Sequence, residues 1–157
     1  AYPHLINSDY IFFLDEDNWY KPNHVESLVA TLEQGNDFAY SLREIYDVDK
    51  NYMCDDNCES LGKWPIFHNE NEFLIDTSSF AFKREFLISA CHLWHSGWGG
   101  DRRFYNIVKQ RPHDTNGTHT LCYRLDGNEG SVKPQFFHEG NDIQHMKYRG
   151  KFPWRKI

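Results

Sequence analysis

The sequence lacks a long apolar run, an excess of positive charge and a dense set of cysteines. Its 157 residues have a mean hydropathy of −0.75, and no stretch approaches the roughly 20 apolar residues that a membrane-spanning helix needs. The formal net charge of −6 provides no basic surface, so nucleic acid is not an expected partner. We expect no signal peptide and predict a cytoplasmic location.

The cysteines are too few for a disulfide framework. Cys54 and Cys58 stand in the polar stretch Cys-Asp-Asp-Asn-Cys, and Cys91 and Cys122 lie far from them. A zinc site needs a second pair of ligands at similar spacing, and no such pair follows. Free thiols are the expected state, with a local disulfide or a zinc site as the open alternatives.

Aromatic residues, in contrast, are abundant at 17% of the chain. They can build a core, and exposed ones form platforms for sugar rings and bases. The length is that of one domain with a core of its own, so we expect residues 1–157 to form a single domain.

The most informative run is residues 11–22. A buried apolar strand ends at Leu14, the acids Asp15-Glu16-Asp17 follow, and Pro22 suits the first turn of a helix. Carboxylates at the carboxyl end of a strand lie where α/β sheets bind ligands. Two aspartates at i and i+2 provide hard oxygen ligands for Mg²⁺ or Mn²⁺. This pattern predicts a metal-assisted site for a phosphorylated substrate.

Two other interpretations of this run stay open. Asp and Asn are common in solvated turns that precede a helix, so the acids can be a simple surface turn. The spacing Asp15-X-Asp17-Asn18 is also that of the start of an EF-hand loop. However, Tyr20 occupies the position where that loop requires glycine, and Pro22 begins a helix inside it.

Hydrophobic periodicity indicates an α/β fold. Val25, Leu28, Val29 and Leu32 recur at helical spacing between Pro22 and Gly35. The other expected elements are strands at 9–14, 38–46, 73–82, 120–124 and 132–137, helices at 83–95 and 101–110, and a long loop at 47–72, with a short hairpin inside it as an open alternative. Because the chain starts just before a core strand, and central parallel strands need neighbours on both sides, we expect it to be the latter part of a larger fold.

A second cluster that could carry chemistry is Trp98-Gly99-Gly100-Asp101-Arg102-Arg103-Phe104-Tyr105. Paired glycines allow the backbone to approach a ligand closely, and Asp101 would stand at a helix N-terminus. An N-cap role alone would explain an aspartate there. Helix-terminal donors favour its ionised form, and a carboxylate within reach of a hydroxyl can accept its proton.

A third cluster is Phe136-Phe137-His138-Glu139-Gly140-Asn141, whose histidine could complete a metal site or touch a diphosphate. A lone histidine among nine is more often an ordinary surface or core residue. His113, His119 and His145 compete for the same role.

Taken together, these motifs resemble the family 2 glycosyltransferases of GT-A fold, from about Tyr10 to the end of the chain. In that family the buried strand ends in an Asp-X-Asp motif, here Asp15-Glu16-Asp17, and a later acid that opens a helix is the catalytic base, here Asp101. Gly-Gly precedes Asp101 where an acidic neighbour is more usual. The resemblance also implies that the N-terminal half, which holds the nucleotide base in that family, is missing from this sequence.

The resemblance implies a GT-A-like three-layer α/β/α fold with a mixed sheet, truncated at its N-terminus. It implies a metal-dependent, inverting transfer of sugar from a nucleoside-diphosphate sugar to an acceptor hydroxyl. The cation, Mn²⁺ or Mg²⁺, would be held by Asp15, Asp17 and His138. Donor contacts are assigned to Asp15, Glu16, Asp17, Trp98, Arg102 and Arg103. The alternative is a non-catalytic sugar- or nucleotide-binding module or an inactive fragment of a larger transferase.

Overall fold

The strands of the chain form one mixed sheet. A computed structural model describes residues 2–64, 66, 73–95 and 97–156. The order across the sheet is β1 (Tyr10–Phe12), β5 (Phe80–Lys83), β3 (Phe38–Tyr46), β6 (His113–Arg124) and β2 (Trp19–Tyr20), and β4 (Tyr52–Asp55) pairs with the end of β3. Only the pairing of β3 with β6 is parallel among the pairs of these named strands. Because β1 and β3 are both antiparallel to β5, the carboxyl ends of β1, β3 and β6 lie at the same edge.

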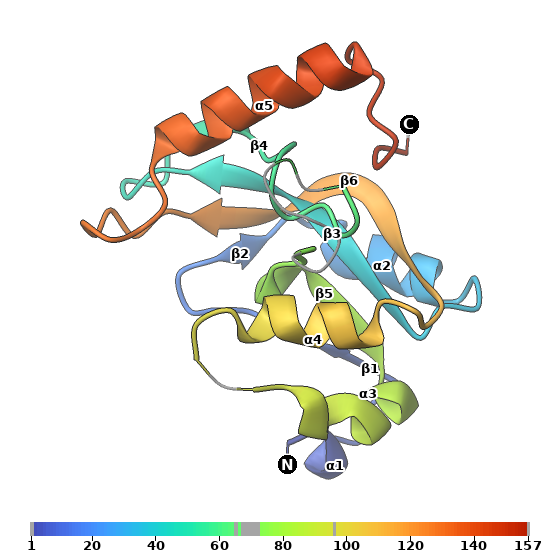
Figure 1. Cartoon of the computed structure of the whole chain (residues 1–157). Coiled ribbons are helices and arrows are strands. Elements are labelled where there is room, and N and C mark those ends of the chain that lie inside the picture. Colours follow the sequence, from blue (N-terminus) through green and yellow to red (C-terminus); the bar gives the residue numbers. More distant parts are fainter. Residues whose placement is uncertain (1, 65, 67–72, 96, 157) are drawn as a thin grey trace.

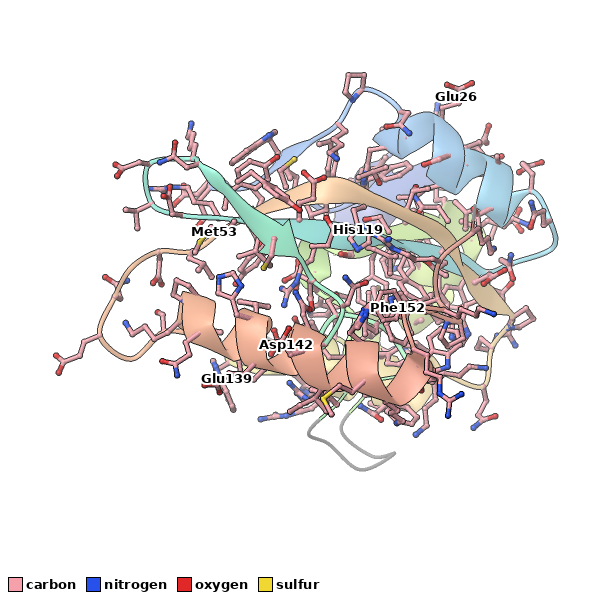
Figure 2. The ribbon with its side chains drawn as sticks, turned by 90° about the horizontal axis from the view of Figure 1, so that it is seen from above. Glu26, Met53, His119, Glu139, Asp142 and Phe152 are labelled. Atoms are coloured by element: carbon pink, nitrogen blue, oxygen red, sulfur yellow. The ribbon has the colours of Figure 1, made fainter. Side chains whose placement is uncertain are left out.

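Helices cover both sides of this sheet. They are α1 (Tyr2–Leu5), α2 (His24–Leu32), α3 (Arg84–Ala90), α4 (Gly100–Val108) and α5 (Pro134–Tyr148), with the short 3₁₀ turns η1 (Thr77–Ser79) and η2 (Cys91–Leu93). Viewed from above, α2 and α5 lie on opposite sides of the strands (Figure 2). In Figure 1, α4 lies in front of the sheet and α5 crosses the top of the molecule. The expected α/β class with three layers and a mixed sheet is confirmed.

The core is centred on β3, which is buried on both faces. Phe38, Tyr40 and Leu42 pack with residues of α3 and α4 in the main aromatic cluster. Ala39, on the other face, packs against Leu28 of α2. The strand was expected over these residues, with these three side chains on one face, and both expectations are confirmed.

The helix expected after Pro22 is α2, but its buried side is rotated relative to the expectation. Leu28 and Leu32 are fully buried, whereas Val25 is exposed. His24 takes the inward position one turn before Leu28. A polar side chain therefore completes the buried stripe, which periodicity of apolar residues alone cannot indicate.

Two predicted strands are wrong in part or in whole. Residues 73–82 do not form one strand, because the Asp76 carboxylate accepts a hydrogen bond from the Ser78 amide and bends the chain into η1 before β5 begins. The strand expected at 132–137 is instead the start of α5, where Pro134 stands in the first helical turn. His138 consequently lies on a helix.

Other boundaries differ less. β1 is shorter than residues 9–14, β6 starts at His113 rather than 120, and β2 was not expected. A helix was expected over 83–95, and the structure divides that stretch into α3 and η2. The loop at 47–72 contains β4, which pairs antiparallel with β3, so the alternative with a short hairpin is the one found. Residues 65 and 67–72 of this loop lie outside the described part of the chain.

Two further observations concern the cysteines and the helices. All four cysteines are free thiols. Among the helices of the described residues, none has both the length and the apolar character that a membrane crossing requires.

A buried histidine makes stability depend on pH. The His24 ring is fully buried, stacks on Tyr20 with ring centroids 3.7 Å apart, and places Nδ1 2.9 Å from Thr120 Oγ1. Burial lowers the pKa of His24 to about 4. An unfolded histidine has a pKa near 6.5. Between about pH 6.5 and pH 4, His24 is therefore protonated in the unfolded state but neutral in the folded state, so stability falls as the pH falls.

We therefore expect His24 to cost about 2 kcal/mol of stability between pH 7.5 and pH 5.0. Urea unfolding of the His24→Gln variant at both pH values should show a smaller loss than the wild type by about that amount. His92→Gln, which replaces an exposed histidine, is the control and should follow the wild type. Equal losses in wild type and His24→Gln would contradict the assignment.

Candidate functional site

The acidic turn stands at the carboxyl edge of β1 and β3, as the sequence predicted. Residues 13–18 connect β1 to β2, and β2 pairs with β6. Asp15 and Glu16 are exposed, Asp17 is half-buried and Asn18 is 7% exposed. The turn thus has a buried amide at its base and carboxylates directed to solvent.

Hydrogen bonds from two neighbouring segments fix this turn. The Ser78 hydroxyl of η1 donates to Asp15 Oδ2 at 2.9 Å and accepts from the Asp15 amide at 3.0 Å. It also accepts from Asn18 Nδ2 at 3.2 Å, while Asn18 Oδ1 accepts from the Arg124 amide at the end of β6. The acidic turn is therefore attached to η1 on one side and to β6 on the other.

A buried ion network lies behind the turn. Arg43 of β3 is 2% exposed and donates to Asp56 at 2.7 Å, to Asp76 at 3.0 Å and to Glu59. Its guanidinium also lies 4.3 Å from the centre of the Tyr123 ring. Burial alone would lower the pKa of Arg43, but the three carboxylates raise it well above its ordinary value. Arg43 is therefore a permanent positive charge.

Asp76 connects this network to the acidic turn. Its Oδ2 accepts from Arg43, and its Oδ1 accepts from the Ser78 amide at 2.9 Å. Burial raises the pKa of Asp76 to about 7; Arg43 lowers it, and the negative charges of Asp101 and Asp15 raise it further. Asp76 thus interacts electrostatically with two of the predicted site acids, Asp15 and Asp101.

Asp101 is half-buried in the first turn of α4. Gly99 precedes the helix with φ of 75°, a left-handed conformation that favours glycine. Asp101 Oδ1 accepts from the Arg102 amide at 2.7 Å. We expected the helix-terminal donors to favour the ionised carboxylate, but burial outweighs them and raises the pKa of Asp101. A raised pKa makes the carboxylate a stronger base than an exposed aspartate.

The remaining predicted donor contacts lie beside Asp101. Trp98 is 96% exposed in the turn before α4. Arg102 and Arg103 follow on the helix and line a hollow of about 350 Å³ together with His95. Glu16 is on the acidic turn instead and is exposed. The structure thus gathers three of these residues at one end of α4.

His138 is exposed on α5. Within residues 2–64, 66, 73–95 and 97–156, no three His, Cys, Asp or Glu side chains form a group able to hold a metal ion. The structure therefore does not bring His138 together with Asp15 and Asp17 as a three-residue metal group.

A cavity of about 360 Å³ lies away from these acids. Tyr40, Lys63, Tyr105, Lys109 and His113 are among its lining residues. Lys109 directly follows the C-terminus of α4, whereas Asp101 is in its first turn. A nine-residue helix is roughly 13 Å long, so this cavity is separate from the acidic edge.

Comparison with known families identifies the chain. A family model described as glycosyl transferase family 2 matches residues 5–105, which is more than half of the sequence. The chain belongs to the family 2 glycosyltransferases. Its mixed α/β architecture is consistent with a GT-A-like fold. A search of the curated proteins finds no match.

Members of this family typically use a divalent cation, and two of the predicted ligands suit one. Asp15 Oδ2 is held by Ser78, and in the described part of the chain no hydrogen bond engages Asp15 Oδ1 or the Asp17 carboxylate. Mg²⁺ and related ions are commonly bound by one or two carboxylates, with phosphate and water completing the shell. The two aspartates of this glycosyltransferase fit such a site.

Three buried residues escaped the sequence analysis, namely Arg43, Asp76 and Ser78. Arg43 offered a signal, because it is a charged residue inside a strand made mostly of apolar and aromatic residues, Phe38–Tyr46, and a buried arginine requires partners. Asp76 and Ser78 have the Asp-X-Ser spacing of a capped turn. That signal was obscured by the apolar residues on both sides.

The buried network of this glycosyltransferase should dominate local stability. Replacing Arg43 with Met leaves three buried or half-buried carboxylates without their cation, and we expect a loss of about 3–5 kcal/mol in the free energy of unfolding. The matched control is Arg111→Met, which breaks an exposed pair with Asp37 and should cost at most about 1 kcal/mol. Urea unfolding measures both, and similar losses would contradict the network's role.

Proposed function

We propose that this protein transfers a sugar from a nucleoside-diphosphate sugar to the hydroxyl of a glycan or another acceptor, with inversion. One observation carries the proposal: Asp76, which caps η1, interacts electrostatically both with Asp15 in the turn after β1 and with Asp101 in the first turn of α4. Because the chain belongs to the family 2 glycosyltransferases, we interpret the acidic turn as the cation side of the site and Asp101 as its base side.

On the cation side, Asp15 and Asp17 would hold Mn²⁺ or Mg²⁺. When bound, the ion would act as a Lewis acid that neutralises the departing diphosphate. The residues assigned to further donor contacts are Glu16, Trp98, Arg102 and Arg103. The exposed indole of Trp98 offers a flat apolar face to a sugar ring, and the two arginines offer positive charge.

On the base side, Asp101 accepts the proton of the acceptor hydroxyl. The acceptor oxygen attacks the anomeric carbon as the bond to the diphosphate breaks on the opposite face, so the configuration inverts. The proton ends on the Asp101 carboxylate. Partial burial, which raises the pKa of Asp101, supports this role because it increases the proton affinity of the carboxylate.

The base assignment predicts a selective loss of turnover. Asp101→Asn should lower kcat by about 10²–10⁴-fold, while the Kd for the nucleoside-diphosphate sugar changes less than about threefold. Transfer assays over a panel of donors, with calorimetric titration of the donor, measure the two quantities. Asp142→Asn on the exposed side of α5 is the control (Figure 2). Unchanged kcat in Asp101→Asn would refute the base role.

The cation assignment predicts that nucleotide binding requires metal. At 100 times its Kd, a nucleoside diphosphate with Mn²⁺ should stabilise the protein by about 2.7 kcal/mol, which raises Tm by about 5–10 °C. Asp15→Asn and Asp17→Asn should abolish the metal-dependent part of this shift. Glu26→Gln also removes one negative charge, but from an exposed position on α2 outside the acidic turn, and should retain the metal-dependent shift (Figure 2). Binding without turnover would favour a non-catalytic binding module.

The third proposed ligand, His138, requires a separate test because the structure leaves it apart on α5. If it joins the cation when donor binds, His138→Ala should weaken Mn²⁺ affinity in the presence of nucleoside diphosphate by about 10-fold. The same titration of His92→Ala is the control. Equal Mn²⁺ affinity in His138→Ala and wild type would remove His138 from the site.

A further inference from the structure

The Ser78 hydroxyl has a fixed hydrogen-bond direction. A hydroxyl has one hydrogen to donate and two lone pairs that accept. The Asp15 amide at 3.0 Å and Asn18 Nδ2 at 3.2 Å are both donors, so they use the two lone pairs. Asn18 must present its nitrogen to Ser78, because its Oδ1 accepts from the Arg124 amide. The only hydrogen of Ser78 therefore goes to Asp15 Oδ2 at 2.9 Å.

Ser78 itself is held from behind. It is fully buried, and its amide donates to Asp76 Oδ1, while the Ser79 amide donates to the Asp76 carbonyl at 2.9 Å. Asp76 Oδ2 is in turn bound by Arg43, and its amide donates to the Ser60 hydroxyl at 2.9 Å. A continuous series of hydrogen bonds thus links the buried arginine of β3 to the surface carboxylate of Asp15.

We propose that Ser78 is a positioning residue for Asp15, and that Asp76 and Arg43 hold Ser78 in place for this task. The inference rests on the proposed function, in which Asp15 binds the cation of the donor. One carboxylate oxygen is fixed by Ser78, and the other is presented at the edge of the sheet. Without Ser78, the exposed side chain of Asp15 would lose this restraint. Cation binding would then cost the conformational entropy of ordering that side chain.

The chain contains a closely matched control for this idea. Ser79 is the next residue of the same 3₁₀ turn and is also fully buried. Its hydroxyl has no hydrogen-bond partner within the described residues. Ser79→Ala therefore removes the same atom from the same turn without breaking a bond to the acidic turn.

The experiment measures Mn²⁺ affinity by the EPR signal of the free ion, with UDP, GDP and ADP tested in turn as the nucleoside diphosphate. Ser78→Ala should raise the Kd for Mn²⁺ about 10-fold, and Ser79→Ala should leave it within about twofold. In the transfer assay, excess Mn²⁺ should restore the kcat of Ser78→Ala, because the defect lies in placing a ligand. An unchanged Kd in Ser78→Ala, or equal changes in both variants, would overturn the proposal.

A second pair of variants, Ser78→Thr and Ser78→Val, separates loss of the hydroxyl from a general folding defect. Thr and Val have the same shape and differ in the hydroxyl, so Ser78→Thr should bind Mn²⁺ more tightly than Ser78→Val by about 10-fold. Equal Kd values in these two variants would overturn the positioning role.

Asp15→Asn in the same titration separates this inference from the function beneath it. If Asp15→Asn weakens Mn²⁺ binding and Ser78→Ala does not, the positioning role fails while the cation assignment stands. If Asp15→Asn itself leaves the Kd unchanged, the cation assignment fails, and the positioning role fails with it.

Discussion

The proposed site depends on one interaction, the burial of the Arg43 guanidinium among carboxylates. A charge removed from water requires partners on every side, and here three carboxylates and an aromatic ring supply them. Two of these carboxylates, Asp56 and Glu59, belong to the loop after β4, and the third, Asp76, opens η1. One buried cation thus joins β3, the loop after β4 and the turn that supports the acids. The ion pairs with Arg43 fix the loop after β4 and the turn at Asp76, although neither segment belongs to a long helix or a strand.

The aromatic core gives the base side a comparable support. Phe104 and Tyr105 of α4 are fully buried, and Phe104 packs edge-on against Phe80 of β5 at 5.9 Å between ring centroids. Asp101 stands one turn earlier on the same helix. Close packing of these rings fixes the helix, and a fixed helix gives its first-turn carboxylate a defined position. The two halves of the proposed site are therefore anchored by different physical means, an ion network and an apolar core.

The sequence predicted the features that depend on residues close together in the chain, and it missed those that depend on residues far apart in it. The acidic turn and Asp101 were found because a short apolar run, a proline and paired glycines mark their positions locally. The partners of Arg43 lie 13, 16 and 33 residues away in the chain, and no periodicity records such pairings. η1 was missed because the apolar residues around it suggested a strand, whereas the hydrogen bond from the Ser78 amide to the Asp76 carboxylate bends the chain into a turn. α5 was missed because Val132 and Phe137 suggested a strand, although Pro134 favoured a helix.

The charge balance of this edge explains why a cation belongs in the proposed mechanism. Arg43 contributes one positive charge, and its three carboxylate partners already outnumber it. Asp15, Glu16, Asp17 and Asp101 add negative charge nearby. A diphosphate that approached these carboxylates would be repelled, at about 1 kcal/mol per pair of unit charges at 4 Å even in bulk water and more near the protein. A divalent cation between the carboxylates and the phosphates reverses the sign of that interaction. Burial, together with the negative charges of Asp101 and Asp15, raises the pKa of Asp76 to about 7. A cation bound beside Asp15 would offset part of that negative charge. Cation binding and deprotonation of Asp76 therefore favour each other.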